Sequence, residues 1–134
     1  MKPVIFCLED FEVHRFMLEF KLLELLGDQV DVRYFVSMQQ LQAFNGPCDL
    51  LISDLNLGDS DSEKTAEFLR RYCEHTPVLV QSTEHTLPNE LETETNGRIT
   101  ATEKAGHGQR FTNAILQFMR EFKEHQNKTP SSRF

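Results

Sequence analysis

Short apolar runs alternate with amphipathic segments along most of this chain, and that alternation is the feature that most restricts its fold. Each run is rich in β-forming residues, and each is followed by a segment whose apolar residues recur at helical spacing. Runs that are apolar throughout are typical of strands buried in a parallel sheet. The repeated strand and helix units predict an α/β fold, a mostly parallel sheet with helices on both faces and right-handed crossovers. The expected strands span residues 3–8, 31–36, 49–53, 78–80 and 99–103.

The first expected helix spans Glu12 to Leu26 and ends at Gly27, a residue type that is common just after a helix. Its apolar residues recur three and four positions apart, and this spacing predicts which face of the helix is buried. The predicted face comprises Val13, Phe16, Met17, Phe20, Leu23 and Leu26.

Capping residues and a proline mark the next two helices. Ser37 is the expected N-cap of a short helix that closes at residues 45–47. Asp61 or Ser62 is the expected cap of the following helix, which ends before Pro77 because the residue preceding a proline disfavours helical geometry.

The C-terminal third is less regular. Residues 84–97 give the weakest helical pattern, because two leucines are their only apolar residues, and a helix there would be short. The last helix carries its apolar face between residues 111 and 122. Residues 126–134 show no periodicity, so we expect a domain of residues 1–125 and a mobile C-terminal tail of residues 126–134.

The composition suits a single globular domain and argues against several kinds of partner. The 134 residues include 39% hydrophobic and 26% charged residues and carry a net charge of −7. That negative charge repels the phosphates of nucleic acid and of anionic membranes. The three cysteines are too far apart for a disulfide framework or a metal-binding pair, and the apolar run at the N-terminus is too short for a signal peptide or a membrane span. We therefore expect a cytoplasmic protein.

Polar and charged residues stand where four of the expected strands end. Glu9 and Asp10 follow the first strand, Asp54 follows the third, Ser82 the fourth and Lys104 the fifth. Because the carboxyl ends of parallel strands meet at one edge of a sheet, where folds of this class place their chemistry, we expect all five side chains to converge.

This set of residues predicts phosphoryl chemistry. Three carboxylates held together repel one another unless a cation is present, and oxygen ligands alone select a hard cation such as Mg²⁺. Lys104 offsets part of the remaining charge. A carboxylate beside a divalent metal, an ammonium group and a hydroxyl can attack a phosphoryl group, because the cations neutralise charge on the transferring oxygens. The expected product is an acyl phosphate on Asp54.

The pattern resembles the receiver domain of two-component response regulators, especially the single-domain chemotaxis type. Receivers carry an acidic pair after the first strand, Asp after the third, Ser or Thr after the fourth and Lys after the fifth. The resemblance covers about residues 3–125 and implies a five-stranded, flavodoxin-like sheet with strand order 2-1-3-4-5. The matching intervals are 44, 28 and 22 residues, between Asp10, Asp54, Ser82 and Lys104.

The resemblance implies a role for each matching residue. Asp54 would be the phospho-acceptor, Ser82 the switch hydroxyl and Lys104 the cation that pairs with the phosphoryl group. The implied magnesium ligands are Asp10 and Asp54, Glu9 through a water molecule, and the main-chain carbonyl of Asn56.

Two implied features concern the lifetime of the phosphorylated state. Asn56 and Glu84 stand at the positions that flank the path of the attacking water, and the same pair occurs in the chemotaxis receiver, a fast self-dephosphorylating member. Thr83 replaces the commoner Ala or Gly, and its branched side chain should obstruct that water.

Three further positions depart from the family pattern. Gly58 stands where many members carry Pro, which leaves the loop after the acceptor freer. Ala101 stands where many members carry the Tyr or Phe that moves on activation. Ala105 replaces a Pro with a cis peptide bond, so we expect a trans bond there.

Three functions of different classes remain open from the sequence. The first is a phosphorylation-dependent switch, which takes a phosphoryl group from a histidine kinase or histidine phosphotransfer protein, promotes its own Mg²⁺-dependent phosphorylation and dephosphorylation, and binds a downstream protein. The second is a receiver-fold interaction module that works without phosphorylation. The third, a phosphohydrolase that forms an aspartyl phosphate, is disfavoured because Asn56 stands where such enzymes carry a second Asp.

Overall fold

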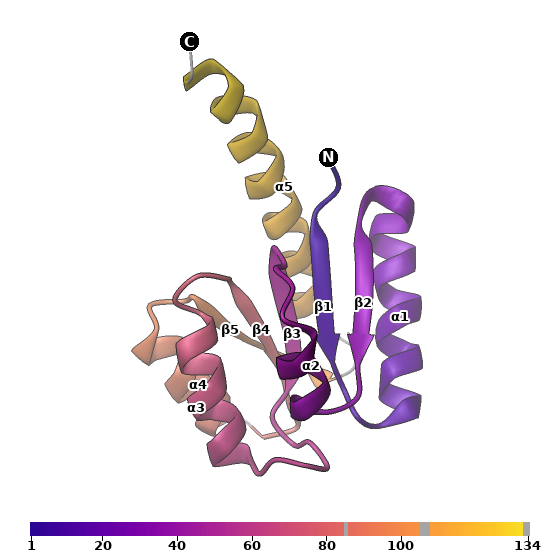
Figure 1. The fold of residues 1–134 in the computed structure, drawn as a ribbon, viewed down its shortest axis with the longest axis vertical. Coiled ribbons are helices and arrows are strands. Elements are labelled where there is room, and N and C mark those ends of the chain that lie inside the picture. The colour runs from indigo at the N-terminus through magenta and orange to yellow at the C-terminus, as the bar shows by residue number, and fades with distance from the viewer. Residues whose placement is uncertain (85, 105–107, 133–134) are drawn as a thin grey trace.

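The computed structural model describes residues 1–84, 86–104 and 108–132, with side chains up to residue 126. Its strands are β1 (Val4–Leu8), β2 (Asp31–Phe35), β3 (Leu50–Asp54), β4 (Val78–Gln81) and β5 (Ile99–Thr102). They form one sheet in the order β2-β1-β3-β4-β5, and every neighbouring pair is parallel (Figure 1). The predicted fold class and strand order are confirmed.

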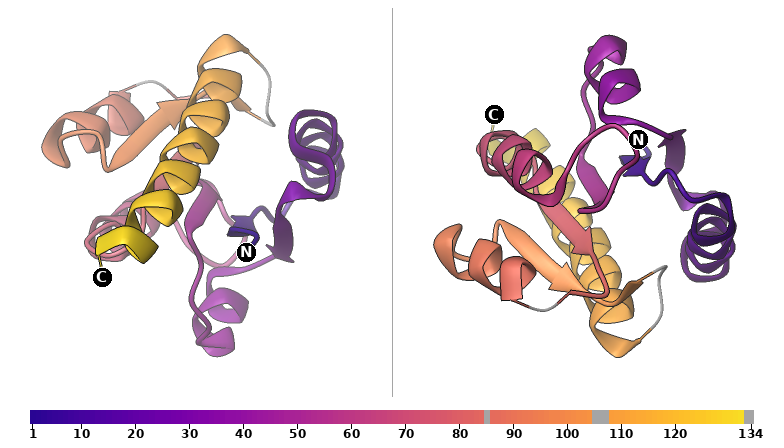
Figure 2. Two further views of the ribbon diagram at one scale, coloured as in Figure 1. Left: turned by 90° about the horizontal axis from the view of Figure 1, so that it is seen from above. Right: turned by 90° about the horizontal axis from the view of Figure 1, so that it is seen from below.

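Five α-helices cover the sheet on both faces. They are α1 (Glu12–Leu26), α2 (Met38–Phe44), α3 (Ser62–Tyr72), α4 (Thr86–Glu94) and α5 (Gln109–Ser132), and a short 3₁₀ turn (Gly27–Gln29) follows α1. Buried residues of α1 and α5 belong to one apolar cluster, and those of α2, α3 and α4 belong to another on the opposite face of the sheet (Figure 2).

The two apolar clusters hold the sheet from both sides. Phe6 and Leu51 point into the cluster under α2, α3 and α4, whereas the adjacent Ile5 and Ile52 belong to the cluster under α1 and α5. This alternation along β1 and β3 is the pattern of strands buried on both faces. The carboxyl ends of these strands are therefore held in fixed positions relative to one another.

Helix α1 has the predicted bounds but not the predicted buried face. Its fully buried residues are Leu18, Leu22 and Leu26, of which only Leu26 was on the predicted face. Apolar side chains occur on every side of α1, so their spacing fits more than one face and the prediction chose the wrong one. Four members of the predicted face are more than half exposed: Val13, Phe16, Phe20 and Leu23.

The helix ends follow the predicted capping chemistry. The Ser37 hydroxyl accepts a hydrogen bond from the Gln40 N–H at 3.0 Å and caps α2. Of the two candidates at the start of α3, Asp61 is the cap, because its carboxylate accepts from the Lys64 N–H at 2.8 Å while Ser62 is already the first helical residue. Both predicted caps are confirmed.

The weakly patterned segment of residues 84–97 does contain a helix, α4. Leu91 is fully buried in the core, and the Glu92 carboxylate accepts a hydrogen bond from the Ala101 N–H of β5 at 2.7 Å. One deeply buried leucine and a polar contact to the neighbouring strand thus hold a helix whose apolar pattern is sparse.

Helix α5 has 24 residues, about 36 Å in length, and extends past the sheet at the top of Figure 1. Regular structure therefore continues beyond residue 125, where we expected the domain to end. The domain boundary and the mobility of residues 126–134 stay predictions. Ala105 lies outside the described residues, and so does its peptide bond.

Over the described part of the chain, no helix combines the length and the apolar character needed to cross a membrane.

Candidate functional site

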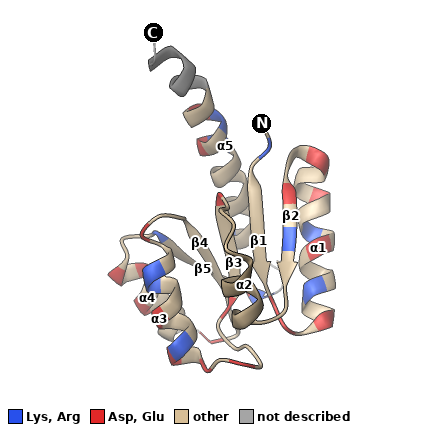
Figure 3. Ribbon diagram, viewed as in Figure 1, with Lys and Arg blue, Asp and Glu red and all other residues tan. Residues whose placement is uncertain are grey.

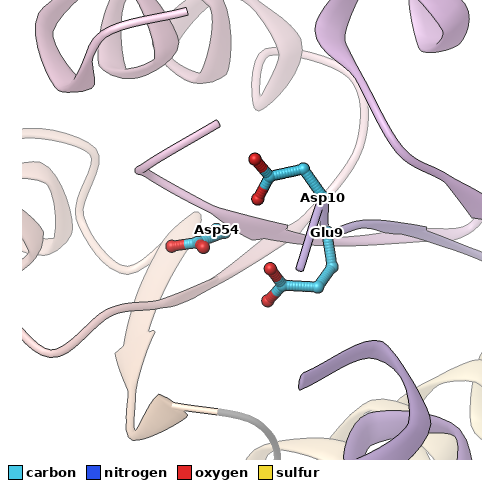
Figure 4. Close-up of side chains that lie close together, drawn as sticks. All are labelled: Glu9, Asp10 and Asp54. Atoms are coloured by element: carbon cyan, nitrogen blue, oxygen red, sulfur yellow. The ribbon is translucent and has the colours of Figure 1, made fainter. Parts of the chain in front are cut away.

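Three acidic side chains meet at the carboxyl ends of β1 and β3. Glu9 and Asp10 directly follow β1, and Asp54 is the last residue of β3. Figure 4 shows that the three side chains lie close together, and one carboxylate oxygen of each lies within 4.8 Å of the others. Acidic residues gather in the loops at this end of the sheet, below the arrowheads of β1 and β2 in Figure 3.

Lys104, which follows β5, joins two of these carboxylates. Its Nζ atom donates to Glu9 Oε1 at 3.0 Å and also to Asp54 Oδ2. Glu9 and Asp54 are 1% and 4% exposed, so this ammonium group balances negative charge that water scarcely reaches. The structure thus brings together four of the predicted site residues from three strands.

Glu9 is engaged through both of its carboxylate oxygens. While Oε1 accepts from Lys104, Oε2 accepts from the Phe11 N–H at 3.2 Å. Burial raises the pKa of the Glu9 carboxyl above its ordinary value, and the nearby Asp54 carboxylate raises it further, whereas Lys104 acts in the opposite direction. The Glu9 side chain is therefore held in place by protein contacts.

The loop after Asp54 lies against the acidic cluster. The Asn56 N–H donates to Asp54 Oδ1 at 3.2 Å, and the Asn56 side-chain oxygen accepts from the Ser62 hydroxyl at 2.7 Å. A Cβ atom at Gly58 would lie 3.2 Å from Asp10 Oδ2, tighter than most such contacts. The close approach gives Gly58 a steric role in addition to the flexibility expected from the sequence.

Ser82 reaches the same edge of the sheet at the end of β4. It is buried, and its hydroxyl oxygen accepts from the Glu84 N–H at 3.0 Å. Thr83 and Glu84 are exposed beside a groove of about 410 Å³, which Ala101 also lines. The catalytic roles of Asp54, Ser82 and Lys104 and the modulating roles of Thr83 and Glu84 stay predictions.

Two buried polar residues in register with Asp54, on β4 and on β5, were missed by the sequence analysis. Gln81 and Thr102 are 1% and 7% exposed, and the sheet register pairs Asp54 with Gln81 and Gln81 with Thr102. The Thr102 hydroxyl donates to the Val80 carbonyl at 3.1 Å. Gln81 was interpreted only as the place where the strand of residues 78–80 stops, and Thr102 only as one residue of the alternating strand of residues 99–103.

The donor set of the acidic cluster fits a hard divalent cation. All three side chains offer carboxylate oxygens, Asp10 is exposed to solvent, and the oxygens are close enough to share one ion. Oxygen-only ligands are those that Mg²⁺ prefers. Glu9, Asp10 and Asp54 could therefore hold such an ion together.

No family model matches the sequence, and no curated protein matches it either. Several solved structures are similar to it. The signal receiver domain of a putative Luxo repressor protein from Vibrio parahaemolyticus has a TM-score of 0.72 and 15% identity, covering 94% of this chain and 96% of that one. The chemotaxis response regulator CheY4 of Vibrio cholerae has a TM-score of 0.66 and 15% identity, covering 88% of this chain and 99% of that one. The BeF3-activated DrrB receiver domain has a TM-score of 0.67 and 12% identity, covering 90% of this chain and 99% of that one.

These similarities show the fold alone, because sequence identities of 12% to 15% are too low to assign a function. They extend over nearly the whole of this chain and of each receiver domain compared. The chain has the receiver-domain fold of response regulators, and it carries an acidic cluster at the sheet edge where the resemblance places the phosphorylation site.

Proposed function

We propose that this protein is a phosphorylation-dependent signalling switch in which Asp54 accepts a phosphoryl group. The observation that carries the proposal is the contact of Lys104 with both Asp54 and Glu9, at the point where three carboxylates meet. A buried carboxylate beside an ammonium group is a nucleophile placed where charge on an incoming phosphoryl group can also be neutralised.

In the proposed reaction, an Asp54 carboxylate oxygen attacks the phosphorus of a phosphohistidine. The new O–P bond forms as the P–N bond breaks, and the electron pair leaves with the histidine nitrogen. Lys104 pairs with the transferring oxygens, and the Ser82 hydroxyl donates a hydrogen bond to one of them. In hydrolysis, a water oxygen attacks phosphorus and the Asp54 carboxylate leaves, so the chain promotes both its own phosphorylation and its own dephosphorylation.

The proposed magnesium ligands are Asp10, Asp54 and the carbonyl of Asn56, with Glu9 acting through water. Both Glu9 oxygens already accept hydrogen bonds from protein groups, which supports an indirect role for this residue. The bound cation supplies further neutralisation of charge on the phosphoryl oxygens.

The proposed phosphodonor is a sensor histidine kinase or a histidine phosphotransfer protein in the cytoplasm, and the proposed output is contact with a downstream protein. Two-component partners are supported by the receiver fold. The net charge of −7 argues against nucleic acid and anionic membrane as targets. We place the output surface on α4, β5 and α5, because Ser82 and Lys104 lie at its edge and a shift toward the phosphoryl group would move the adjoining loops.

An interaction module that works without phosphorylation is the second candidate. Ala101 favours it, because the resemblance places a mobile aromatic residue there and this chain has only a methyl group beside the groove. If the switch operates, the segment of residues 83–87, which includes the first residues of α4, has to carry the change in place of a rotating ring.

Beryllofluoride, which mimics a phosphoryl group on a carboxylate, separates the two candidates. The measurement compares backbone amide spectra with and without beryllofluoride and Mg²⁺. For the switch we expect shifts at the residues next to Asp54 that extend through the segment of residues 83–87 into the rest of α4 and into β5. We expect no shifts in Asp54→Ala. An unchanged wild-type spectrum would overturn the switch and favour the interaction module.

A further inference from the structure

Gln81 carries a buried side-chain nitrogen that has no hydrogen-bond partner among the described residues. It is the last residue of β4 and is 1% exposed. Across the described residues, its Nε2 atom finds no hydrogen-bond acceptor. Burying an amide donor without a partner is unfavourable, and most buried polar groups in proteins are hydrogen-bonded. An unpaired donor at this position calls for an explanation.

The sheet register places Gln81 beside the proposed phospho-acceptor. Asp54 and Gln81 are paired residues on the neighbouring parallel strands β3 and β4, so their side chains leave the same face of the sheet. Neighbouring strands are about 4.8 Å apart, a distance that a glutamine side chain can span. Two residues earlier on each strand, Ile52 and Leu79 pack with Phe111 of α5, so the surroundings on this face are apolar.

The neighbouring hydrogen-bonding groups are already engaged. Asp54 accepts from Lys104 at Oδ2 and from the Asn56 N–H at Oδ1. Thr102, the partner of Gln81 on the other side, donates its hydroxyl to the Val80 carbonyl. In the unphosphorylated protein, the Gln81 amide is thus the donor left over in a row of buried polar residues.

We infer that Gln81 is a hydrogen-bond donor to the phosphorylated form of Asp54, an inference that rests on the proposed function. When Asp54 becomes an acyl phosphate, its negative charge moves to the phosphoryl oxygens, and Lys104 follows that charge because charge-assisted hydrogen bonds are the stronger ones. The new bond to phosphorus forms at Asp54 Oδ1, so Oδ2 becomes the carbonyl oxygen of the acyl phosphate and loses Lys104 as its donor. The Gln81 side-chain N–H takes that place.

This contact would favour the phosphorylated state. The Gln81 amide is unpaired before phosphorylation and paired after it, so its hydrogen bond contributes to only one of the two states. A residue with this property shifts the equilibrium toward the state in which it is satisfied. Removing it should therefore weaken binding of a phosphoryl mimic without harming the fold.

The test compares two substitutions that each remove a buried polar group from the same row. Gln81→Leu keeps most of the side-chain volume and removes an unpaired donor, whereas Thr102→Val removes a donor that is already hydrogen-bonded. For each variant, urea unfolding gives the midpoint, and a titration in the presence of Mg²⁺ gives the beryllofluoride concentration at half-saturation.

We expect Gln81→Leu to need about fivefold more beryllofluoride, the effect of losing one ordinary hydrogen bond, while its unfolding midpoint is equal to or higher than that of the wild type. Thr102→Val should have a lower midpoint and unchanged beryllofluoride binding. In wild-type spectra, the side-chain NH₂ resonances of Gln81, assigned by their loss in Gln81→Leu, should move when beryllofluoride binds.

The outcomes separate this inference from the function on which it rests. If the wild type binds no beryllofluoride, the phosphorylation site itself is wrong and Gln81 loses its proposed acceptor. If the wild type binds it and Gln81→Leu binds it equally well, the inference alone is overturned. A lowered midpoint in Gln81→Leu with unchanged binding would likewise assign Gln81 a purely structural role.

Discussion

Asp59 links the loop that follows Asp54 to the start of α2 through hydrogen bonds. Its carboxylate accepts hydrogen bonds from the Met38 and Gln39 N–H groups, both at 3.1 Å. The first N–H groups of a helix have no partner within the helix, so a carboxylate from another segment can satisfy them. These hydrogen bonds from Gln39 and Met38 lower the pKa of the Asp59 carboxyl below its ordinary value.

The lowered pKa of Asp59 predicts a pH-dependent contribution to stability. A carboxyl with a lowered pKa in the folded state stabilises the fold fully above the ordinary Asp pKa of about 3.9, and that contribution disappears as the pH falls through the lowered value. We expect Asp59→Ala to unfold at lower urea concentration than the wild type near neutral pH, and this difference to shrink in acid. Asp59→Asn removes the titrating group and serves as the control. A wild-type advantage over Asp59→Ala that persists undiminished in strong acid would contradict this role.

Glu9 and Asp10 differ in their surroundings, and this difference predicts unequal effects on metal binding. Asp10 is exposed at the cluster, whereas both oxygens of the buried Glu9 are engaged by Lys104 and the Phe11 N–H. We expect Asp10→Asn to lower the affinity for Mg²⁺ more than Glu9→Gln does, as measured by isothermal titration. Equal affinities for both variants and the wild type would refute the proposed metal site.

Asn56 and Thr83 are expected to set the lifetime of the phosphorylated state in opposite directions. The Asn56 side chain is held by Ser62 at the rim of the site and can retain a water molecule, whereas the branched side chain of Thr83 obstructs one. We expect Thr83→Ala to lose phosphate faster, by about tenfold, which corresponds to ~1.4 kcal/mol of barrier, and Asn56→Met to lose it more slowly. The measurement is the decay of pulse-labelled protein, and slower decay in Thr83→Ala would show that the steric argument has the wrong sign.

Helix α1 shows what its sequence pattern could and could not predict. Its bounds and its terminal Gly27 were predicted because capping residues and the end of an apolar pattern are local signals. Its buried face was not, because apolar residues surround this helix and only the position of the sheet selects Leu18, Leu22 and Leu26. Four of the other apolar side chains, Val13, Phe16, Phe20 and Leu23, are exposed, and Phe20 is 72% exposed.

A pair of substitutions in α1 tests the observed face. Leu22 is 2% exposed, so Leu22→Ala should lower the free energy of unfolding by about 2–5 kcal/mol. Phe20 is exposed, so Phe20→Ala should change the free energy of unfolding by no more than about 0.5 kcal/mol. Urea denaturation of both variants gives the comparison. A larger loss for Phe20→Ala than for Leu22→Ala would support the face first predicted from the spacing.

Helix α4 was difficult to predict for a different reason. Its contacts with the rest of the fold are partly polar, since the Glu92 carboxylate accepts from the Ala101 N–H and from Arg110. Polar contacts between residues of different elements leave no apolar periodicity in the sequence. A sparse apolar pattern is therefore compatible with an ordered helix when side chains of neighbouring elements hold it.

The fold could be predicted from the sequence to a greater extent than the contacts within the site. The five strand segments, each followed by a helical segment, predict a parallel sheet, and the residues at the strand ends identify which edge carries the charged residues. Both predictions follow from local sequence. The structure then places Lys104 between Glu9 and Asp54. The strand register places Gln81 alongside Asp54 and Thr102 alongside Gln81. Register and side-chain pairing depend on how the whole sheet packs, so these features could not be derived from strand positions alone.

The central claim is that Asp54 accepts a phosphoryl group with the help of the surrounding charges. The most direct test incubates the protein with acetyl phosphate, with and without Mg²⁺, and measures the intact mass of the wild type and of Asp54→Ala. We expect the wild type to gain the mass of one phosphoryl group only when Mg²⁺ is present, and Asp54→Ala to gain none. No gain in the wild type, or an equal gain in Asp54→Ala, would contradict the account.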